Sequence, residues 1–173
     1  MFDDNFVIVD LETTALSPVQ GEIIEIGAIK VVNNEIVDKM NIFIKPSKPV
    51  SYFTTKLTGI TNDMLKDGYH IKEALEIFDD FSDGMRLMAH NAKFDLSFLN
   101  CYMDAHLNKC CSENVMDTLM LSRAILKDVP NHKLGTLAEY FDIDYTGAHR
   151  SLKDCDITYD VYNNIRNIYE NGN

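Results

Sequence analysis

Residues 6–12 read Phe-Val-Ile-Val-Asp-Leu-Glu, and this stretch decides the fold class. Its first four side chains are apolar, which is typical of a strand covered by helices on both faces, so we expect a strand over residues 6–11. Side chains alternate along a strand, and those of Asp10 and Glu12 therefore point to the same face. Two carboxylates this close repel each other unless a countercharge lies between them, and a divalent cation is the simplest one. A hydrated pair of acids at a strand end is the alternative.

The chain beyond this strand alternates between strand and helix patterns. Residues 23–32 and 35–44 predict a β-hairpin whose turn is Asn33-Asn34, and Thr61 or Asn62 caps a short helix. A helix follows Gly68 and stops at Gly84, and a strand over 86–89 leads to a helix that carries Phe98. A strand at 115–116 then leads to a helix that carries Leu119. The last two predicted helices cover residues 135–141 and 152 to about 169. This order predicts an α/β domain with a mixed sheet.

The composition limits the classes of protein to consider. The 173 residues are 46% hydrophobic and 25% charged, which predicts one ordinary globular domain over residues 1–173. The formal net charge of −11 argues against a protein that wraps a polyanion through its overall charge. No apolar stretch is long enough to span a bilayer, and the N-terminus is acidic where a secretory signal would be basic. We therefore expect a cytoplasmic protein with no membrane contact.

The cysteines form no C-x-x-C pair; they are Cys101, Cys110, Cys111 and Cys155. Reduced thiols are the favoured interpretation. A zinc site built from Cys101, His106, Cys110 and Cys111 is a weaker alternative.

Two later aspartates favour a cation site over a hydrated pair of acids at Asp10 and Glu12. Asp95 and Asp154 each precede the apolar stripe of their own predicted helix, so both face inward near a helix N-terminus. Aspartate is rarely buried unless it is paired or bound to a cation, and an interaction with the helix dipole explains one such residue better than two. His149 lies in the loop before the last helix, where a histidine beside carboxylates suits a general base. An exposed surface histidine is the alternative.

The four acids offer only oxygen ligands, which favour Mg²⁺ or Mn²⁺ over zinc. Two such ions about 4 Å apart are the usual arrangement for in-line attack on a phosphodiester. The residues alone therefore point to phosphodiester hydrolysis with two divalent metal ions.

Three separated segments carry this chemistry: Asp10-Leu11-Glu12-Thr13-Thr14, His90-Asn91-Ala92-Lys93-Phe94-Asp95 and His149-Arg150-Ser151-Leu152-Lys153-Asp154. Together they resemble the motifs of the DnaQ-like, or DEDDh, 3′–5′ exonucleases, the family of the proofreading subunit of bacterial replicative DNA polymerase. The likeness runs from about residue 6 to about residue 168, in the family's order. The resemblance implies an RNase H-like fold with a five-stranded mixed sheet flanked by helices.

The resemblance also implies roles for the charged residues. Asp10, Glu12, Asp95 and Asp154 would hold two divalent metal ions, with Asp10 as the bridge between them. His149 would be the general base for the attacking water.

Substrate contacts follow from the same resemblance. Thr13 and Leu16 would lie against the terminal nucleotide, and Asn91 would contact the strand. Ala15 stands where the family often has glycine, a change that alters the backbone path over that nucleotide. Asp117, although acidic, is better interpreted as a helix cap than as a ligand.

Four cations flank the motifs and are either hydrated side chains or phosphate contacts: Lys93, Lys133, Arg150 and Lys153. In so acidic a chain they predict a modest, salt-sensitive affinity for a short strand end.

We therefore predict a metal-dependent 3′–5′ exonuclease that releases nucleoside 5′-monophosphates from single-stranded or frayed DNA ends. An exoribonuclease that trims RNA or short oligoribonucleotides is the alternative, because no residue identifies a contact to the 2′-hydroxyl. A non-catalytic module that binds nucleic-acid ends or a polymerase is less favoured, because no ligand is missing. The short tail after the last predicted helix favours a stand-alone nuclease or an excised domain over one with a DNA polymerase partner.

Overall fold

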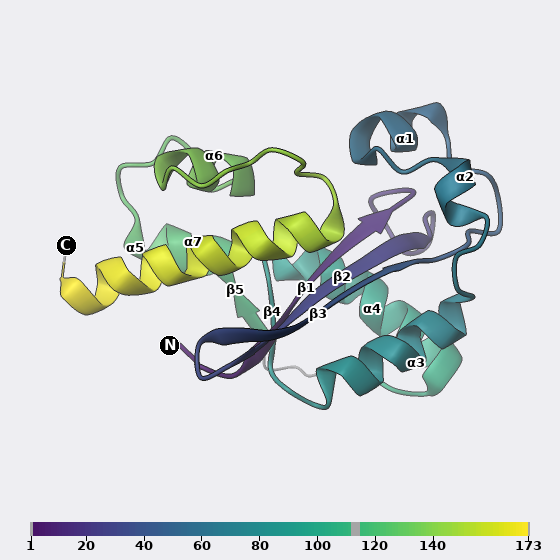
Figure 1. Cartoon of the computed structure of the whole chain (residues 1–173), viewed down its shortest axis with the longest axis horizontal. Helices are drawn as coiled ribbons and strands as arrows, with labels where there is room; N and C mark the ends of the chain where they lie inside the picture. Colours follow the sequence, from purple (N-terminus) through teal and green to yellow (C-terminus); the bar gives the residue numbers. More distant parts are fainter. Residues whose placement is uncertain (1, 112–114, 173) are drawn as a thin grey trace.

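A five-stranded sheet forms the centre of the fold (Figure 1). The computed structural model describes residues 2–111 and 115–172. Strands β1 (Phe6–Thr13), β2 (Ile23–Val32) and β3 (Glu35–Phe43) are antiparallel neighbours, whereas β4 (Leu87–Ala89) and β5 (Val115–Asp117) continue the sheet in parallel. The order β3-β2-β1-β4-β5 places β1 in the middle. The predicted α/β architecture with a mixed sheet is confirmed.

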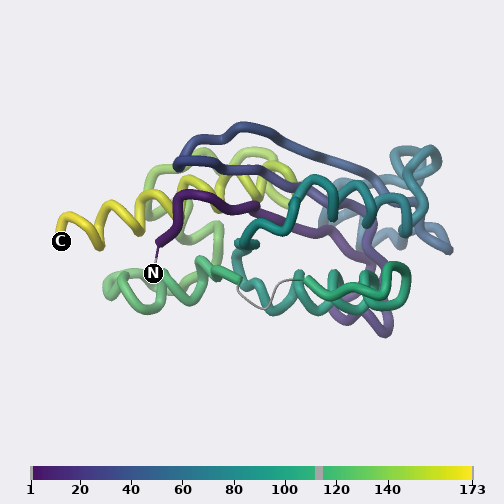
Figure 2. Tube along the Cα trace, turned by 90° about the horizontal axis from the view of Figure 1, so that it is seen from below, coloured from purple at the N-terminus to yellow at the C-terminus, as the bar shows by residue number. Residues whose placement is uncertain are grey.

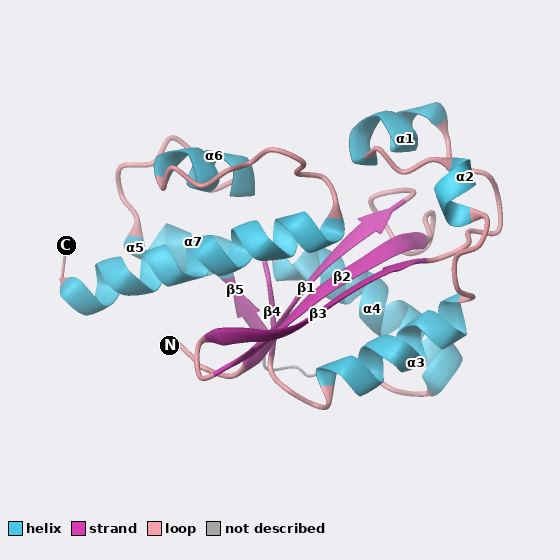
Figure 3. Ribbon diagram, in the orientation of Figure 1, coloured by secondary structure: helices cyan, strands magenta, loops and turns pink. Residues whose placement is uncertain are grey.

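Helices cover both faces of this sheet (Figure 3). On one face lie α3 (Ile71–Ser82) and α4 (Ala92–Leu107). On the other face lie α5 (Thr118–Ile125), α6 (Leu134–Tyr140) and α7 (Ser151–Asn171). The central strands are therefore buried from both sides, which is why their sequences are almost continuously apolar.

The side chains of β1 alternate between the two helical layers, and this alternation positions the acids. Val7 and Val9 pack in the core with α3 and α4, whereas Phe6 and Ile8 pack against α7. Asp10 and Glu12 continue the second series along the strand. Their carboxylates therefore emerge on the α7 side of the sheet.

Helix α7 lies close to β2 because residue 27 is glycine. A Cβ atom at Gly27 would lie 2.4 Å from backbone atoms of Ser151 and Leu152, which is closer than such atoms approach in real structures. The absent side chain therefore lets the first turn of α7, which contains Asp154, rest directly on the sheet.

The hairpin between β2 and β3 forms as predicted. Asn33 and Asn34 occupy its turn with φ angles of 53° and 59°, the left-handed conformation that a two-residue hairpin loop needs. Strand β1 runs two residues beyond its predicted end, to Thr13, because its last residues still pair with β2.

The connection from β3 to α3 holds two short helices, α1 (Tyr52–Thr58) and α2 (Asn62–Leu65), near the end of β1 (Figure 1). The sequence predicts α2, and the hydroxyl of Thr61 caps it by accepting a hydrogen bond from the amide of Met64 at 3.3 Å. The sequence does not predict α1. Its large side chains are mostly exposed, so no buried apolar stripe marks the helix.

Both ends of the described chain lie at the end of the molecule opposite α1 and α2 (Figure 2). Within residues 2–111 and 115–172, no helix combines the length and the apolar character needed to cross a membrane.

Candidate active site

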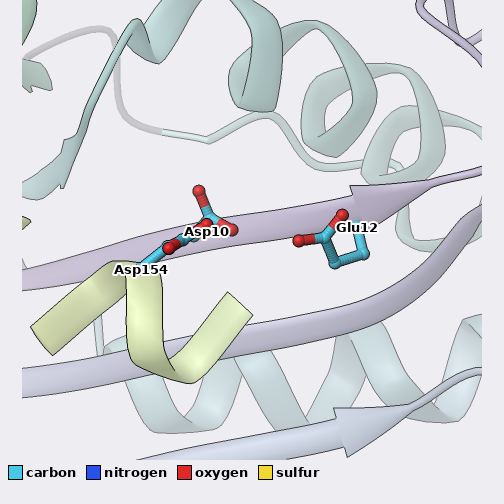
Figure 4. Close-up of side chains that lie close together, drawn as sticks. All are labelled: Asp10, Glu12 and Asp154. Carbon is cyan, nitrogen blue, oxygen red and sulfur yellow. The ribbon is translucent and has the colours of Figure 1, made fainter. Parts of the chain in front are cut away.

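Three acids meet where the end of β1 faces the start of α7 (Figure 4). Asp10 and Glu12 come from β1 and Asp154 comes from the first turn of α7. One carboxylate oxygen from each lies within 4.8 Å of the others. Residues separated by more than 140 positions in the sequence thus form one acidic cluster, which we call the acid trio.

Asp95, the fourth predicted ligand, lies beside the acid trio rather than within it. It belongs to α4, on the opposite face of the sheet, and its side chain is only 3% exposed. Its Oδ1 accepts a hydrogen bond from the amide of Leu11 at 3.1 Å. Its charge nevertheless raises the pKa of Asp10, after the larger effect of burial, so the two carboxyls are electrostatic neighbours.

Burial and mutual repulsion disfavour ionisation throughout this cluster. Burial, followed by the charge of Asp154, raises the pKa of Glu12 to about 8, and burial raises the pKa of Asp95 to about 8. Burial also raises the pKa of Asp154. Oδ1 of Asp154 is buried and has no hydrogen-bond partner within the described residues. Oxygen-only donors, an unpartnered buried oxygen and uncompensated negative charge together fit a hard divalent cation.

We expect the metal-free protein to lose stability through this cluster as the pH rises from 4.5 to about 8, the interval between the ordinary and folded-state pKa of Glu12. A carboxyl with a raised pKa binds its proton more tightly in the folded chain, so losing that proton favours unfolding. Added Mg²⁺ or Mn²⁺ offsets the repulsion. The melting temperature should therefore rise more on adding the cation near pH 8 than near pH 4.5, by about 2–4 °C for each kcal/mol.

Scanning fluorimetry with and without a chelator measures this effect. Asp154→Asn should shrink the cation-induced rise, whereas Asp160→Asn, an exposed position on the same helix, should keep it. An equal cation-induced rise in melting temperature in both variants would show that the cation binds outside the acid trio.

His149 lies at the rim of the acid trio. Its backbone N–H donates a hydrogen bond to Oδ2 of Asp154 at 3.2 Å, and its side chain is exposed. The residue has a φ of 64°, and the ring of Tyr145 meets its imidazole edge-on with centroids 6.3 Å apart. Asp10, Asp154, Tyr145 and His149 line one cavity of about 720 Å³. An imidazole therefore borders the same space as two of the three acids.

A partly buried ion pair fixes the backbone next to His149. Arg150 donates from Nη2 to Oε1 of Glu25 at 2.7 Å, and Glu25 is fully buried. The amide of Ser151 donates to the other oxygen of the same carboxylate at 3.1 Å. Sequence reasoning missed this pair and left Arg150 as a candidate phosphate contact. The available signal was a glutamate in the middle of the apolar strand over residues 23–32.

The predicted nucleotide contacts Thr13 and Leu16 line a separate cavity of about 480 Å³ on the other side of Glu12. Leu16 is 88% exposed, and Oγ1 of Thr13 donates to the carbonyl of Ala15 at 2.7 Å. The opposite wall comes from α1, which contributes Phe53 and Leu57. Sequence reasoning missed both because α1 carries no buried stripe. The lining is apolar and suits the flat face of a base.

Asn91 and Asp117 are neighbouring residues at the starts of α4 and α5, where Asp117 also ends β5. Asn91 has a φ of 66° and lines the larger cavity with His149. Asp117 caps α5 by accepting from the amide of Leu119 at 2.9 Å, and it also accepts from the amides of Asn91 and Ala92. The prediction that Asp117 is a cap is confirmed.

The zinc alternative has no support in the described residues. The acid trio is the one group of three or more candidate metal ligands that residues 2–111 and 115–172 bring together. Cys101 and Cys110 are exposed, whereas Cys111 is buried beside Met103, and all of the cysteines are free thiols.

Comparison with known proteins identifies the class of protein to which the fold and the acid trio belong. Residues 7–162 match the profile of the family described as Exonuclease (RNase_T). The chain therefore belongs to this exonuclease family, which confirms the resemblance to the DnaQ-like exonucleases and assigns the chain to the nucleic-acid hydrolases.

Two curated relatives are PolC-type DNA polymerase III proteins. The chain is 44% identical over 160 residues to that of Caldanaerobacter subterraneus subsp. tengcongensis, covering 92% of this chain and 11% of the relative. It is 40% identical over 157 residues to that of Bacillus subtilis, covering 90% of this chain and 11% of the relative. The chain thus spans about a tenth of the length of these relatives.

Two solved structures share the fold. Exonuclease X in complex with 5′ overhanging duplex DNA has a TM-score of 0.74 at 24% identity, covering 94% of this chain and 91% of that one. Escherichia coli exonuclease I in complex with a dT13 oligonucleotide has a TM-score of 0.78 at 14% identity, covering 95% of this chain and 41% of that one. The expected RNase H-like fold is confirmed.

Proposed function

We propose that this chain hydrolyses the terminal phosphodiester bond at the 3′ end of DNA, single-stranded or frayed, and releases nucleoside 5′-monophosphates. The observation that carries the proposal is the acid trio, which lies between an apolar cavity and a polar one. Exonuclease relatives support the reaction class. Both similar structures are complexes with DNA, which supports DNA as the substrate.

The carboxylates would hold two divalent ions, Mg²⁺ or Mn²⁺. Asp10, Glu12 and Asp154 face the shared space, and Asp95 would join them from α4. When bound, such ions lower the pKa of a water molecule and stabilise the charge that develops on the phosphoryl group.

The other residues position the reactants and move a proton. His149 accepts the proton of the attacking water from the open side of the cavity. The backbone hydrogen bond from His149 to Asp154 keeps that imidazole near the trio. Leu16 and Thr13 hold the terminal nucleoside in the apolar cavity, and Asn91 contacts the strand across from them.

A DNA polymerase is the partner that we propose, because both relatives described above are PolC-type polymerases. The residues 1–173 would act as one exonuclease domain that removes nucleotides from a growing 3′ end. Such a partner implies a cytoplasmic location.

Digestion of 5′-labelled oligonucleotides in Mg²⁺ or Mn²⁺ tests the function, with matched DNA and RNA sequences in parallel. The expected result is a ladder of shortened DNA products that disappears with Asp10→Ala. Faster shortening of the RNA would favour the exoribonuclease alternative. Binding of ends with no ladder in any divalent ion would favour a non-catalytic module.

A further inference from the structure

The larger cavity beside the acid trio has two chemically different walls. Asp10, Asp154 and His149 form one wall. The opposite wall comes from α5 and the segment before α6, and it carries Arg123 and Lys133. Both of these side chains are exposed. In a chain with a net charge of −11, two cations that face the same space as the reacting acids are an unusual local concentration of positive charge.

Two other cations near the trio, Arg150 and Lys153, are already engaged in ion pairs. Arg150 is bonded to the buried carboxylate of Glu25, and Nζ of Lys153 lies 3.8 Å from a carboxylate oxygen of Asp144. Among the described residues, neither Arg123 nor Lys133 has a carboxylate within ion-pair distance. They are therefore the cations of this cavity that are available to an anion.

Hydrogen bonds hold the cationic wall in place. The ring of His90 spans it, with Nδ1 at 2.9 Å from Oγ1 of Thr118 and Nε2 at 3.0 Å from the carbonyl of His132. Oδ1 of Asn131 accepts from the amide of Lys133 at 3.0 Å. Because these bonds tie the segment before α6 to the start of α5, the backbone that carries both cations is fixed before any ligand arrives.

The two cavities share no lining residue and border different members of the acid trio. The apolar one includes Glu12 and α1, whereas the cationic one includes Asp10 and the segment before α6. In Figure 1 the N-terminal end of α7 lies between α1 and α6. A base fits the apolar side and a chain of phosphates fits the cationic side. A strand whose terminal nucleoside occupies the apolar cavity therefore runs from the scissile phosphate toward Arg123 and Lys133.

We propose that Arg123 and Lys133 bind the phosphates immediately upstream of the scissile bond, so that this wall guides the remaining single strand. The proposal rests on the proposed function for the position of the scissile phosphate. It makes these residues the main source of strand affinity in a chain whose overall charge repels DNA.

Equilibrium binding tests the proposal. The titration uses fluorescent oligothymidylate of ten nucleotides and the full chain, in a His149→Gln background that retains all of the carboxylates. Arg123→Gln and Lys133→Gln should each weaken binding about 5- to 10-fold, the size of one partly exposed charge-assisted contact. Each should also reduce the slope of log affinity against log salt by about 0.7. Lys72→Gln, an equal charge change on α3, should leave both values as they are.

Kinetics with two substrates provides the second readout. The p-nitrophenyl ester of thymidine 5′-monophosphate has one phosphodiester and no upstream strand. The ratio of kcat/KM for the oligonucleotide to that for the ester should fall about 10-fold or more in the double variant, mostly through KM.

Unchanged salt slopes in both single variants would overturn the proposal, as would an unchanged substrate ratio in the double variant. If the unmodified chain hydrolyses neither substrate, the proposed function fails. The binding slopes still decide whether Arg123 and Lys133 hold a strand, because they do not depend on turnover.

Discussion

Asp154→Asn is expected to slow hydrolysis of a DNA 3′ end by about 10³-fold or more, since bound cations contribute several kcal/mol to the transition state and each 1.36 kcal/mol is tenfold in rate. Asp154 belongs to the trio with Asp10 and Glu12, and its buried Oδ1 has no hydrogen-bond partner among the described residues, which leaves that oxygen available to a cation. Asparagine has nearly the same shape but removes the charge. Its amide oxygen can still accept the hydrogen bond from the backbone of His149.

The loss should therefore come from the chemistry and not from unfolding. The metal-free variant should melt no lower than the unmodified chain near pH 8, because a repelling charge is gone. Asp160→Asn is the matched control on α7, and single-turnover rates at saturating oligonucleotide provide the measurement. A rate for Asp154→Asn within tenfold of the control would contradict a metal-dependent reaction at this site.

His149→Asn should reduce the same rate by about 10² to 10⁴-fold, the usual contribution of a positioned general base. Asparagine tolerates the left-handed backbone of residue 149, so the loop keeps its path. The hydrogen bond to Asp154 comes from the backbone of residue 149, so the substitution leaves it in place. The variant should consequently retain the cation-induced rise in melting temperature.

Chemical rescue separates a proton acceptor from a structural side chain. Glycine also tolerates the backbone of residue 149, and His149→Gly opens space beside Tyr145. Added imidazole should restore part of the rate of His149→Gly and none of the rate of Asp154→Asn. His106→Asn, an exposed histidine on α4, should behave as the unmodified chain. Full activity of His149→Asn would show that His149 is not the general base.

Local sequence patterns predict the parts of this fold that depend on local physics. The apolar run before Asp10 gives β1, and Asn33-Asn34 gives the hairpin turn through its left-handed angles. The alternation of β1 also places Asp10 and Glu12 on one face, where they form the acid trio with Asp154. The roles of these residues in binding metal remain predictions, as does the role of His149.

Features that depend on residues far apart in the sequence could not be predicted from local sequence patterns. Arg150 and Glu25 are 125 positions apart, so nothing near either residue indicates the pair. Helix α1 buries only two threonines, and its exposed Phe53 and Leu57 give no apolar stripe. Asp95 precedes an apolar stripe like that of Asp154, so the two residues look alike in the sequence. Only the structure shows that α4 and α7 pack on opposite faces of the sheet.

The ion pair between Arg150 and Glu25 constrains the loop that carries His149. Arg150 follows His149 directly, and withdrawing its guanidinium would leave the fully buried carboxylate of Glu25 with the Ser151 amide as its remaining partner, which destabilises the fold. The backbone after His149 is thus held in place, whereas the loop before it turns at Gly147, which has a φ of 80°. If the chain hydrolyses DNA ends as proposed, the released mononucleotide would therefore pass an imidazole that turns about its own bonds, while the first turn of α7 would stay docked on the sheet.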